Sequence, residues 1–206
     1  MGNSGQQSSL YKINEIFYSI QAEGYHAGTA AVFIRFADCN LRCDFCDTEF
    51  LSGVDMSVSE IMGNIRDYPS RFVLITGGEP LMNDTTELLT ALKNDGYYVA
   101  VETNGMSFPK HELFDWITIS PKSDKLKIRK CNELKVLLGI DELPETYGIE
   151  AEHRYISPKN PTHDLPIGTH SAGFFDRNVA QYCYRYVLKH PEWRLSLQMH
   201  KVIGVK

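Results

Sequence analysis

Short apolar runs recur along this chain, and polar or small residues follow each of them. The runs cover about residues 13–20, 30–36, 71–75, 97–101, 116–119, 133–138, 154–156 and 193–197. Helices are expected between several runs: from the Ser57–Glu60 capping box to Asp67, from near Asp84 (with Glu87 at the capping-box position) to Asp95, and over Asp176 to Lys189. Strands that alternate with helices predict a mainly parallel α/β sheet of six to seven strands, with a site at their carboxyl ends.

Three of the five cysteines follow the second run on one short loop, spaced C-x-x-x-C-x-x-C: Cys39, Cys43 and Cys46. Three thiolates cannot all pair as disulfides, and soft thiolate ligands suit zinc or an iron–sulfur cluster. A closed zinc site needs four protein ligands, so the fourth would have to come from Cys131, Cys183, His26 or His200. The pattern favours a four-iron cluster with one iron open to a cofactor or substrate. A zinc-stabilised binding module without catalysis is the alternative.

The length and charge of the chain limit the kinds of protein that it can be. A chain of 206 residues can bury a core without disulfides, and we expect one domain over residues 1–206 with a flexible polar tail at 1–9. The net charge of −5 gives no electrostatic case for direct nucleic-acid binding. No apolar run approaches membrane-spanning length and no secretory pattern opens the chain, so we expect a cytoplasmic protein without a membrane partner. An odd number of cysteines fits that reducing compartment, with Cys131 and Cys183 buried as small apolar residues.

Two other features could carry chemistry. The segment Thr76–Pro80, Thr-Gly-Gly-Glu-Pro, follows a strand but lacks the lysine and the spacing of a phosphate-binding P-loop. Its glycines would let the backbone approach a ligand, and Glu79 could accept hydrogen bonds from an ammonium, although a plain strand-to-helix turn is the better explanation of the segment alone. Arg35 lies inside an apolar run, where an unpaired charge is costly. A substrate carboxylate is its favoured partner, and an internal ion pair is the alternative.

In their order and spacing, these motifs resemble a known family. The cysteine loop with Gly77-Gly78-Glu79-Pro80 resembles the radical S-adenosylmethionine (SAM) superfamily, and the chain from about residue 13 to its end resembles the 7-carboxy-7-deazaguanine synthase (QueE) family within it. The family motifs are Ile20-Gln21-Ala22-Glu23-Gly24, Cys46-Asp47-Thr48, Thr76 to Pro80, Glu102-Thr103-Asn104-Gly105, Ser120-Pro121-Lys122, Glu133-Leu134-Lys135 and the ending at 194–201. The resemblance implies a partial, open β/α barrel of the radical SAM type with few helices, and 206 residues with six to seven strands are few for a complete eight-unit barrel.

The resemblance also implies a set of site residues. Cys39, Cys43 and Cys46 would hold a 4Fe-4S cluster whose open iron binds SAM, and Thr48 would bind Mg²⁺. SAM would be contacted by Phe45, Cys46, Asp47, Gly78, Ser120, Pro121, Lys122, Ser157 and Pro158. The substrate site would be lined by Ile20, Gln21, Ala22, Glu23, Arg35, Thr76, His200 and Lys206. Ala22 replaces the usual glycine of the family, and Ser157 replaces a common glutamine. By residue type alone, Asp47 and Thr48 could cap a turn, Lys122 could be solvated, and His200 could be a packed or surface residue.

The reaction implied by the resemblance converts 6-carboxy-5,6,7,8-tetrahydropterin to 7-carboxy-7-deazaguanine with loss of ammonia, in queuosine or other 7-deazapurine biosynthesis. An electron enters the cluster, SAM is cleaved, and a 5′-deoxyadenosyl radical abstracts a hydrogen from C6 of the substrate. A flavodoxin- or ferredoxin-like electron donor and a homodimer are implied by the same resemblance. A glycyl-radical-enzyme activase shares the cysteine loop and a similar size, but Gln21, Arg35 and Thr48 favour a small carboxylated pterin.

Overall fold

One nine-stranded sheet runs through the part of the chain that the computed structural model describes, residues 9–46, 48–108, 111–159 and 175–205. Its strands are β1 (Leu10–Ile20), β2 (Ala30–Phe36), β3 (Val54–Ser57), β4 (Phe72–Gly77), β5 (Tyr98–Thr103), β6 (Trp116–Ile119), β7 (Lys130–Leu138), β8 (Glu150–Pro158) and β9 (Arg194–Leu195). The helices are α1 (Val58–Ile65), α2 (Thr86–Asn94), α3 (Arg177–Lys189) and α4 (Met199–Ile203), with short 3-10 turns η1 (Pro80–Met82) and η2 (His111–Leu113).

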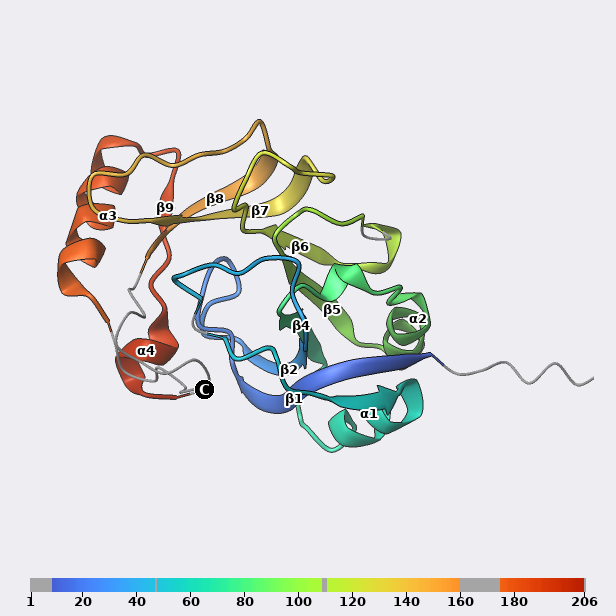
Figure 1. Ribbon diagram of the computed structural model, residues 1–206. Helices are drawn as coiled ribbons and strands as arrows, with labels where there is room; N and C mark the ends of the chain where they lie inside the picture. The colour runs from blue at the N-terminus through green and yellow to red at the C-terminus, as the bar shows by residue number, and fades with distance from the viewer. Residues whose placement is uncertain (1–8, 47, 109–110, 160–174, 206) are drawn as a thin grey trace, which may run out of the picture.

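The sheet is mainly parallel and remains open. The strand order is β3-β1-β2-β4-β5-β6-β7-β8-β9, so β3 and β9 are the two edges. Strand β1 pairs antiparallel with β2 and β3, and every pair from β2 to β9 is parallel. Figure 1 shows the curved sheet, with α1 beside β1 and β3, α2 beside β5, and α3 beside β8 and β9. This architecture confirms the expected partial barrel. The expected six to seven strands fall short of nine. The eight apolar runs coincide with eight of the strands, and the ninth, β3, is a four-residue edge strand without an apolar run.

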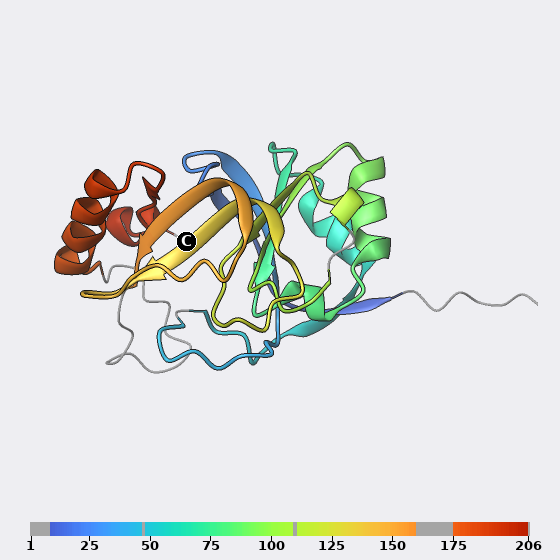
Figure 2. The same ribbon diagram turned by 90° about the horizontal axis from the view of Figure 1, so that it is seen from above.

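Alternation along the strands separates two faces. In β2, Val32, Ile34 and Phe36 are fully buried in the large core that α1 and α2 cover, whereas Phe33 belongs to a smaller cluster on the opposite, concave face. The view from above shows α1 and α2 together at one end of the sheet, and α3 with α4 at the other (Figure 2). Among the described residues, therefore, no long helix packs over the centre of the concave face, and its polar residues can form a site.

The helix starts test two of the expected capping patterns. Ser57 and Glu60 form the predicted capping box of α1, with each side chain accepting from the backbone of the other. The second pattern was wrong: α2 begins at Thr86 after Thr85, without a side-chain cap, and Glu87 accepts a hydrogen bond from the backbone N–H of Ser9. The tertiary contact with the N-terminal segment takes the carboxylate that the local pattern assigned to the cap. None of the helices in the described residues combines the length and apolarity that crossing a bilayer requires.

An apolar row forms the floor of the concave face. Phe17 pairs with Phe33 across β1 and β2, and their rings stack with centroids 4.7 Å apart. The row continues through Leu74, Ala100 and Trp116, which are paired neighbours in β4, β5 and β6. This apolar floor lies below the residues that come next on the same face of these strands.

Candidate active site

A row of polar side chains lies directly above the apolar floor. Two residues further along their strands, Arg35 pairs with Thr76, and Thr118 pairs with both Glu102 and Glu133. Because side chains alternate along a strand, these residues point to the same concave face as the floor. The curved sheet thus gathers charges from β2, β5 and β7 that are far apart in the sequence.

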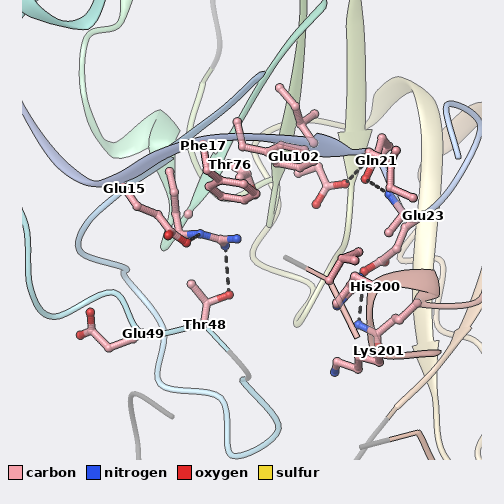
Figure 3. Close-up of a pocket in the computed structure, with 18 residues that line it drawn as sticks. Glu15, Phe17, Gln21, Glu23, Thr48, Glu49, Thr76, Glu102, His200 and Lys201 are labelled. Atoms are coloured by element: carbon pink, nitrogen blue, oxygen red, sulfur yellow. Dashed lines mark hydrogen bonds and ion pairs between the residues drawn. The ribbon is translucent and has the colours of Figure 1, made fainter. Parts of the chain in front are cut away.

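The polar row opens into a pocket of about 270 Å³. It is lined by Glu15, Phe17, Ile20, Gln21, Ala22, Glu23, Phe33, Arg35, Thr48, Glu49, Leu74, Thr76, Gly77, Glu102, Gln198, His200, Lys201 and Val205. Figure 3 shows Glu15 and Thr48 on one side of this pocket and Glu102, Gln21 and Glu23 on the other. Seven of the eight expected substrate residues line it; the eighth, Lys206, lies outside the described residues.

At one end of the pocket, Arg35 forms the internal ion pair that was the alternative to a substrate carboxylate, and it also contacts Thr48. Its Nε lies 3.0 Å from Glu15 Oε1, and its guanidinium donates to Thr48 Oγ1 at 3.3 Å. Both charged side chains are about one-fifth exposed, because they form part of the pocket wall. The internal ion pair therefore exists, and the same guanidinium faces the space available to a ligand. This end offers cationic N–H donors and a hydroxyl.

At the other end, the pocket wall is acidic. Glu102 Oε1 accepts hydrogen bonds from Gln21 Nε2 and Lys135 Nζ, both at 3.0 Å. Lys135 also lies 2.9 Å from Glu23 Oε2, and its side chain is 6% exposed. Burial alone would raise the pKa of Glu23, but Lys135 and, to a smaller extent, His200 lower it to about 2. Glu23 is therefore ionised, and this end presents hydrogen-bond acceptors.

The loop after β1 and the C-terminal segment hold one another over the pocket. Ala22 accepts at its carbonyl from Met199 N–H, and Gly24 N–H donates to Ser196 Oγ. Gln198 Nε2 donates to Glu23 Oε1 at 3.3 Å. These contacts join residues more than 170 positions apart, and they complete the wall only when both ends of the sheet are formed.

A second pocket of about 190 Å³ opens beside the first one. Thr76, Gly77, Glu102, Gln198 and Lys201 line both pockets, so the two spaces adjoin along these residues. The second pocket is also lined by Cys39, Leu41, Cys43, Phe45, Cys46, Gly78, Thr103, Asn104, Ser120, Lys122, Leu137, Pro158 and Lys159. All three cysteines of the short loop therefore share one wall, opposite the ends of β6 and β8.

The paired glycines bring the end of β4 against the cysteine loop. A Cβ at Gly78 would overlap the carbonyl oxygen of Asp38, and a Cβ at Gly77, whose φ is +129°, would overlap that of Phe36. Backbone hydrogen bonds join the same segments: Gly78 N–H donates to Phe36, and Glu79 N–H donates to Asp38. Close approach of backbone to backbone therefore explains both glycines, and Gly78 still lines the second pocket.

Glu79 connects the strand ends and is not directed at a ligand. It is fully buried, and it accepts from Leu81 N–H, Thr103 Oγ1 and Asn104 N–H at 2.7 to 3.1 Å. Burial raises the pKa of its carboxyl, and these three donors act against that shift. The expectation that Glu79 could accept from a ligand ammonium gives way to a structural role, because its oxygens bond to η1 and to the end of β5, and its side chain lines neither pocket.

Lys122 and Lys159 place positive charge in the second pocket, beside the ring of Phe45. Lys122 Nζ donates to Ser120 Oγ at 2.6 Å and lies 5.6 Å from the centroid of the Phe45 ring. Burial lowers the pKa of Lys122 to about 8. Lys159 lies over the same ring at 5.3 Å. An anionic ligand group in this pocket would meet two ammonium groups close to the cysteines.

Two other expected SAM contacts are placed differently. Pro121 is buried and does not line the second pocket, unlike its neighbours Ser120 and Lys122. Ser157 is fully buried outside both pocket walls, and its Oγ has no hydrogen-bond partner among the residues that the structure describes, whereas Pro158 does line the second pocket. Asp47 lies outside the described residues.

Similarity to known proteins identifies the family of this chain. Residues 33–135 match the Radical SAM superfamily. The chain is 41% identical over 198 residues to a 7-carboxy-7-deazaguanine synthase of Bacteroides thetaiotaomicron, covering 96% of this chain and all of the relative. It is 38% identical over 204 residues to the synthase of Synechocystis sp., covering 95% and 94% of the two chains. The chain belongs to the 7-carboxy-7-deazaguanine synthase family.

The fold agrees with this membership. The crystal structure of QueE from Escherichia coli matches with a TM-score of 0.68 and 23% identity, over 91% of this chain and 93% of that one. Membership makes this chain a radical SAM enzyme, and the superfamily implies a 4Fe-4S cluster and SAM as its cofactors. The resemblance drawn from the motifs is thereby confirmed.

The cysteine pocket fits such a cluster. Cys39, Cys43 and Cys46 share a wall, yet within the described residues no three His, Cys, Asp or Glu side chains converge where one metal ion could bind. In a four-iron cluster each thiolate binds a different iron, so convergence on one point is not needed. None of the four side chains that could complete a zinc site lines this pocket, and Cys131 and Cys183 are buried in the main core as predicted.

Several residues that line the pockets, or bond to a residue that does, carried no role in the sequence analysis. They are Glu15, Glu49, Glu102, Lys135, Gln198 and Lys201. Glu102 and Lys135 stand in apolar strands, as Arg35 does, and period-two alternation could have assigned all three to one face. Gln198 and Lys201 gave no such signal, because the short α4 reaches the site only through its contacts with the β1–β2 loop.

Proposed function

We propose that this enzyme converts 6-carboxy-5,6,7,8-tetrahydropterin to 7-carboxy-7-deazaguanine with loss of ammonia. The observation that carries the proposal is the polarity of the first pocket, with Arg35 and Thr48 at one end and Glu102 and Gln21 at the other. A pterin carboxylate needs cationic donors, and the opposite edge of the pterin, with its 2-amino group and ring N–H, needs acceptors. The pocket also adjoins the three-cysteine wall, where radical chemistry begins.

The residues around the pocket have complementary tasks in this assignment. Arg35 binds the substrate carboxylate, and Glu102 accepts from the donor edge while Gln21 holds its other oxygen. Ile20, Ala22 and Thr76 shape the walls, and Glu23 and His200 line the acidic side. The apolar floor excludes water from below, so the ligand is oriented in a partly dry space. Lys206, which lies outside the described residues, is proposed as a further substrate contact.

In the second pocket, Cys39, Cys43 and Cys46 would hold the cluster. Phe45, Asp47, Gly78, Ser120, Lys122 and Pro158 would contact SAM, with the two ammonium groups near Phe45 suited to its carboxylate. When bound, the cluster and SAM supply a 5′-deoxyadenosyl radical that abstracts hydrogen from C6 of the substrate. The chain holds that carbon in place through the polar contacts at both ends of the pterin.

Thr48 is proposed as the protein ligand of Mg²⁺. A hard cation with few protein ligands suits one hydroxyl together with substrate oxygens. Since Thr48 Oγ1 accepts from Arg35, a cation there requires the guanidinium to turn away, and the substrate carboxylate offers it a new partner. Substrate and Mg²⁺ would then bind together rather than separately.

The proposed location, partners and pathway of the enzyme are those that membership of the family suggests. We place the enzyme in the cytoplasm as a homodimer, with a flavodoxin- or ferredoxin-like electron donor, in queuosine or another 7-deazapurine pathway. The absence of a membrane-spanning helix among the described residues is compatible with that setting. No direct nucleic-acid partner is proposed for a chain of net charge −5.

Anaerobic turnover tests the proposed function. The enzyme, reconstituted with iron and sulfide, is incubated with SAM, a reductant, Mg²⁺ and 6-carboxytetrahydropterin, and mass spectrometry should detect 7-carboxy-7-deazaguanine and released ammonia. Cys43→Ala should lose iron and turnover, whereas Cys131→Ala, at a cysteine of the main core, should retain iron. SAM cleavage without the deazaguanine product would reject the substrate. A colourless, zinc-containing protein would reject the whole assignment.

A further inference from the structure

Lys135 of β7 is a cation buried among carboxylates. Its Nζ lies 2.9 Å from Glu23 Oε2 and 3.0 Å from Glu102 Oε1, and its side chain is 6% exposed. Glu133, two residues earlier on the same face of β7, is 3% exposed and acts electrostatically on the same ammonium. The ammonium of Lys135 therefore interacts with three acidic side chains from different parts of the fold: Glu23 after β1, Glu102 of β5 and Glu133 of β7.

Lys135 lines neither pocket, so it reaches a ligand only through its partners. Glu102 lines both pockets, and its Oε1 accepts from Lys135 and from Gln21. Its Oε2 accepts no hydrogen bond from the residues that the structure describes. Two donors thus hold one oxygen of the carboxylate and leave the other one available to a ligand.

The charge of Lys135 also holds two carboxylates together. Without this cation, Glu23 and Glu102 would be like charges in a partly dry space and would repel each other, so Glu102 would leave its position at the pocket wall. Burial would lower the pKa of Lys135, but Glu102 and Glu23 outweigh burial and raise it, so the lysine stays charged.

We propose that Lys135 is a positioning residue that holds one oxygen of Glu102 and thereby directs the other oxygen at the donor edge of the pterin. It thereby sets selectivity for a ligand with an amino group at this edge over one with a carbonyl. This inference rests on the proposed function, because it assumes that the first pocket holds a pterin. It assigns the selectivity to a residue that never touches the substrate.

Two probes that differ at this edge test the inference: pterin-6-carboxylate, with a 2-amino group, and lumazine-6-carboxylate, with a 2-oxo group. Dissociation constants are measured anaerobically on the cluster-loaded enzyme with SAM present. The wild type should favour the pterin by about 10- to 100-fold, as expected for a hydrogen bond to a charged group. Lys135→Met should weaken pterin binding until the ratio is within about threefold. Lys135→Arg, which keeps the charge, should restore most of the ratio.

Matched measurements separate positioning from damage to the fold. Lys93→Met removes a lysine whose Nζ lies 2.6 Å from Asp115 far from the site, and it should leave the ratio unchanged. SAM affinity should be the same in all variants. The inference is overturned if Lys135→Met keeps the wild-type ratio, or if it weakens pterin, lumazine and SAM to the same extent.

A folding defect in Lys135→Met would not end the test. Glu102→Gln keeps the shape of the side chain and removes its charge, and it should reduce the probe ratio in the same way. Retention of the full ratio by Glu102→Gln would overturn the inference. A wild type that binds neither carboxylate probe would reject the proposed function itself, which is a different result from a wild type that binds both probes without preference.

Discussion

At the scale of single residues, charges inside apolar strands mark this site. Arg35, Glu102 and Lys135 each interrupt a run of buried residues, where an unpaired charge is expensive. Each is paired by a group from another element: Arg35 by Glu15, and Lys135 by Glu23 and Glu102. These ion pairs satisfy the charges and at the same time place them around a ligand.

Thr48 provides a test at this scale. Thr48→Ala should retain iron and SAM affinity but weaken the apparent affinity for Mg²⁺ in turnover, because the hydroxyl is the proposed protein ligand. The loss should be at least the roughly 10- to 100-fold that changes around metal ligands cost. Turnover is measured against Mg²⁺ concentration. Thr48→Ser retains the hydroxyl and should behave as the wild type; an unchanged Mg²⁺ dependence in Thr48→Ala would reject the ligand assignment.

At the scale of elements, the turn after β4 fixes the cysteine loop. Two glycines permit contact with the backbone at Phe36 and Asp38, and Glu79 ties the same turn to the end of β5. The three cysteines are therefore presented by a loop that packs against two strand ends. A side chain introduced at Gly78 should disturb the cluster site, because its Cβ would overlap the backbone at Asp38 and lie 3.1 Å from Cys39 Cβ.

Gly78→Ala tests this arrangement. The new Cβ would overlap the carbonyl oxygen of Asp38, so the backbone must move, and we expect about 1 to 3 kcal/mol of destabilisation with a reduced iron content. Gly63→Ala in α1 is the matched control, because its Cβ meets only an Arg66 side-chain atom at 3.6 Å. The Gly63→Ala variant should have a free energy of unfolding that is higher than that of the wild type by up to about 1 kcal/mol. Unfolding free energy and iron per chain are measured, and equal effects of the two changes would contradict the packing argument.

At the scale of the whole molecule, sheet curvature collects acidic groups whose ionisation depends on the complete fold. Burial raises the pKa of Glu133 to about 7, whereas Lys135 outweighs burial at Glu23 and lowers its pKa to about 2. A carboxyl group whose pKa is raised in the folded state stabilises the fold at pH values below its ordinary pKa. This stability is lost as the pH rises through the folded-state pKa. The lowered pKa of Glu23 has the opposite effect: its contribution to stability is lost only as the pH falls below the ordinary pKa of a glutamate. Between pH 4.5 and 7, therefore, Glu133 lowers stability as pH rises.

Glu133→Gln should flatten this pH dependence. Glutamine can still accept from Tyr25 N–H but takes up no proton, so stability near pH 8 should rise relative to that near pH 5 by about 2 to 3 kcal/mol. Unfolding free energies at four pH values between 5 and 8 check the slope. Glu145→Gln changes an exposed carboxylate and should keep the wild-type slope. A wild-type slope in Glu133→Gln would show that its carboxyl is not the group responsible.

The sequence alone determined the strand–helix alternation, the three-cysteine loop at a strand end and the motifs that identify the family. Local spacing and residue chemistry are sufficient for such features, as the Ser57–Glu60 capping box shows. Only the tertiary structure decided that Glu79 bonds to β5, that Ser157 turns away from both pockets, and that Glu102 and Lys135 belong to the polar site. Those outcomes depend on which strands become neighbours and on how the sheet curves, and both are settled by contacts between residues far apart in the chain.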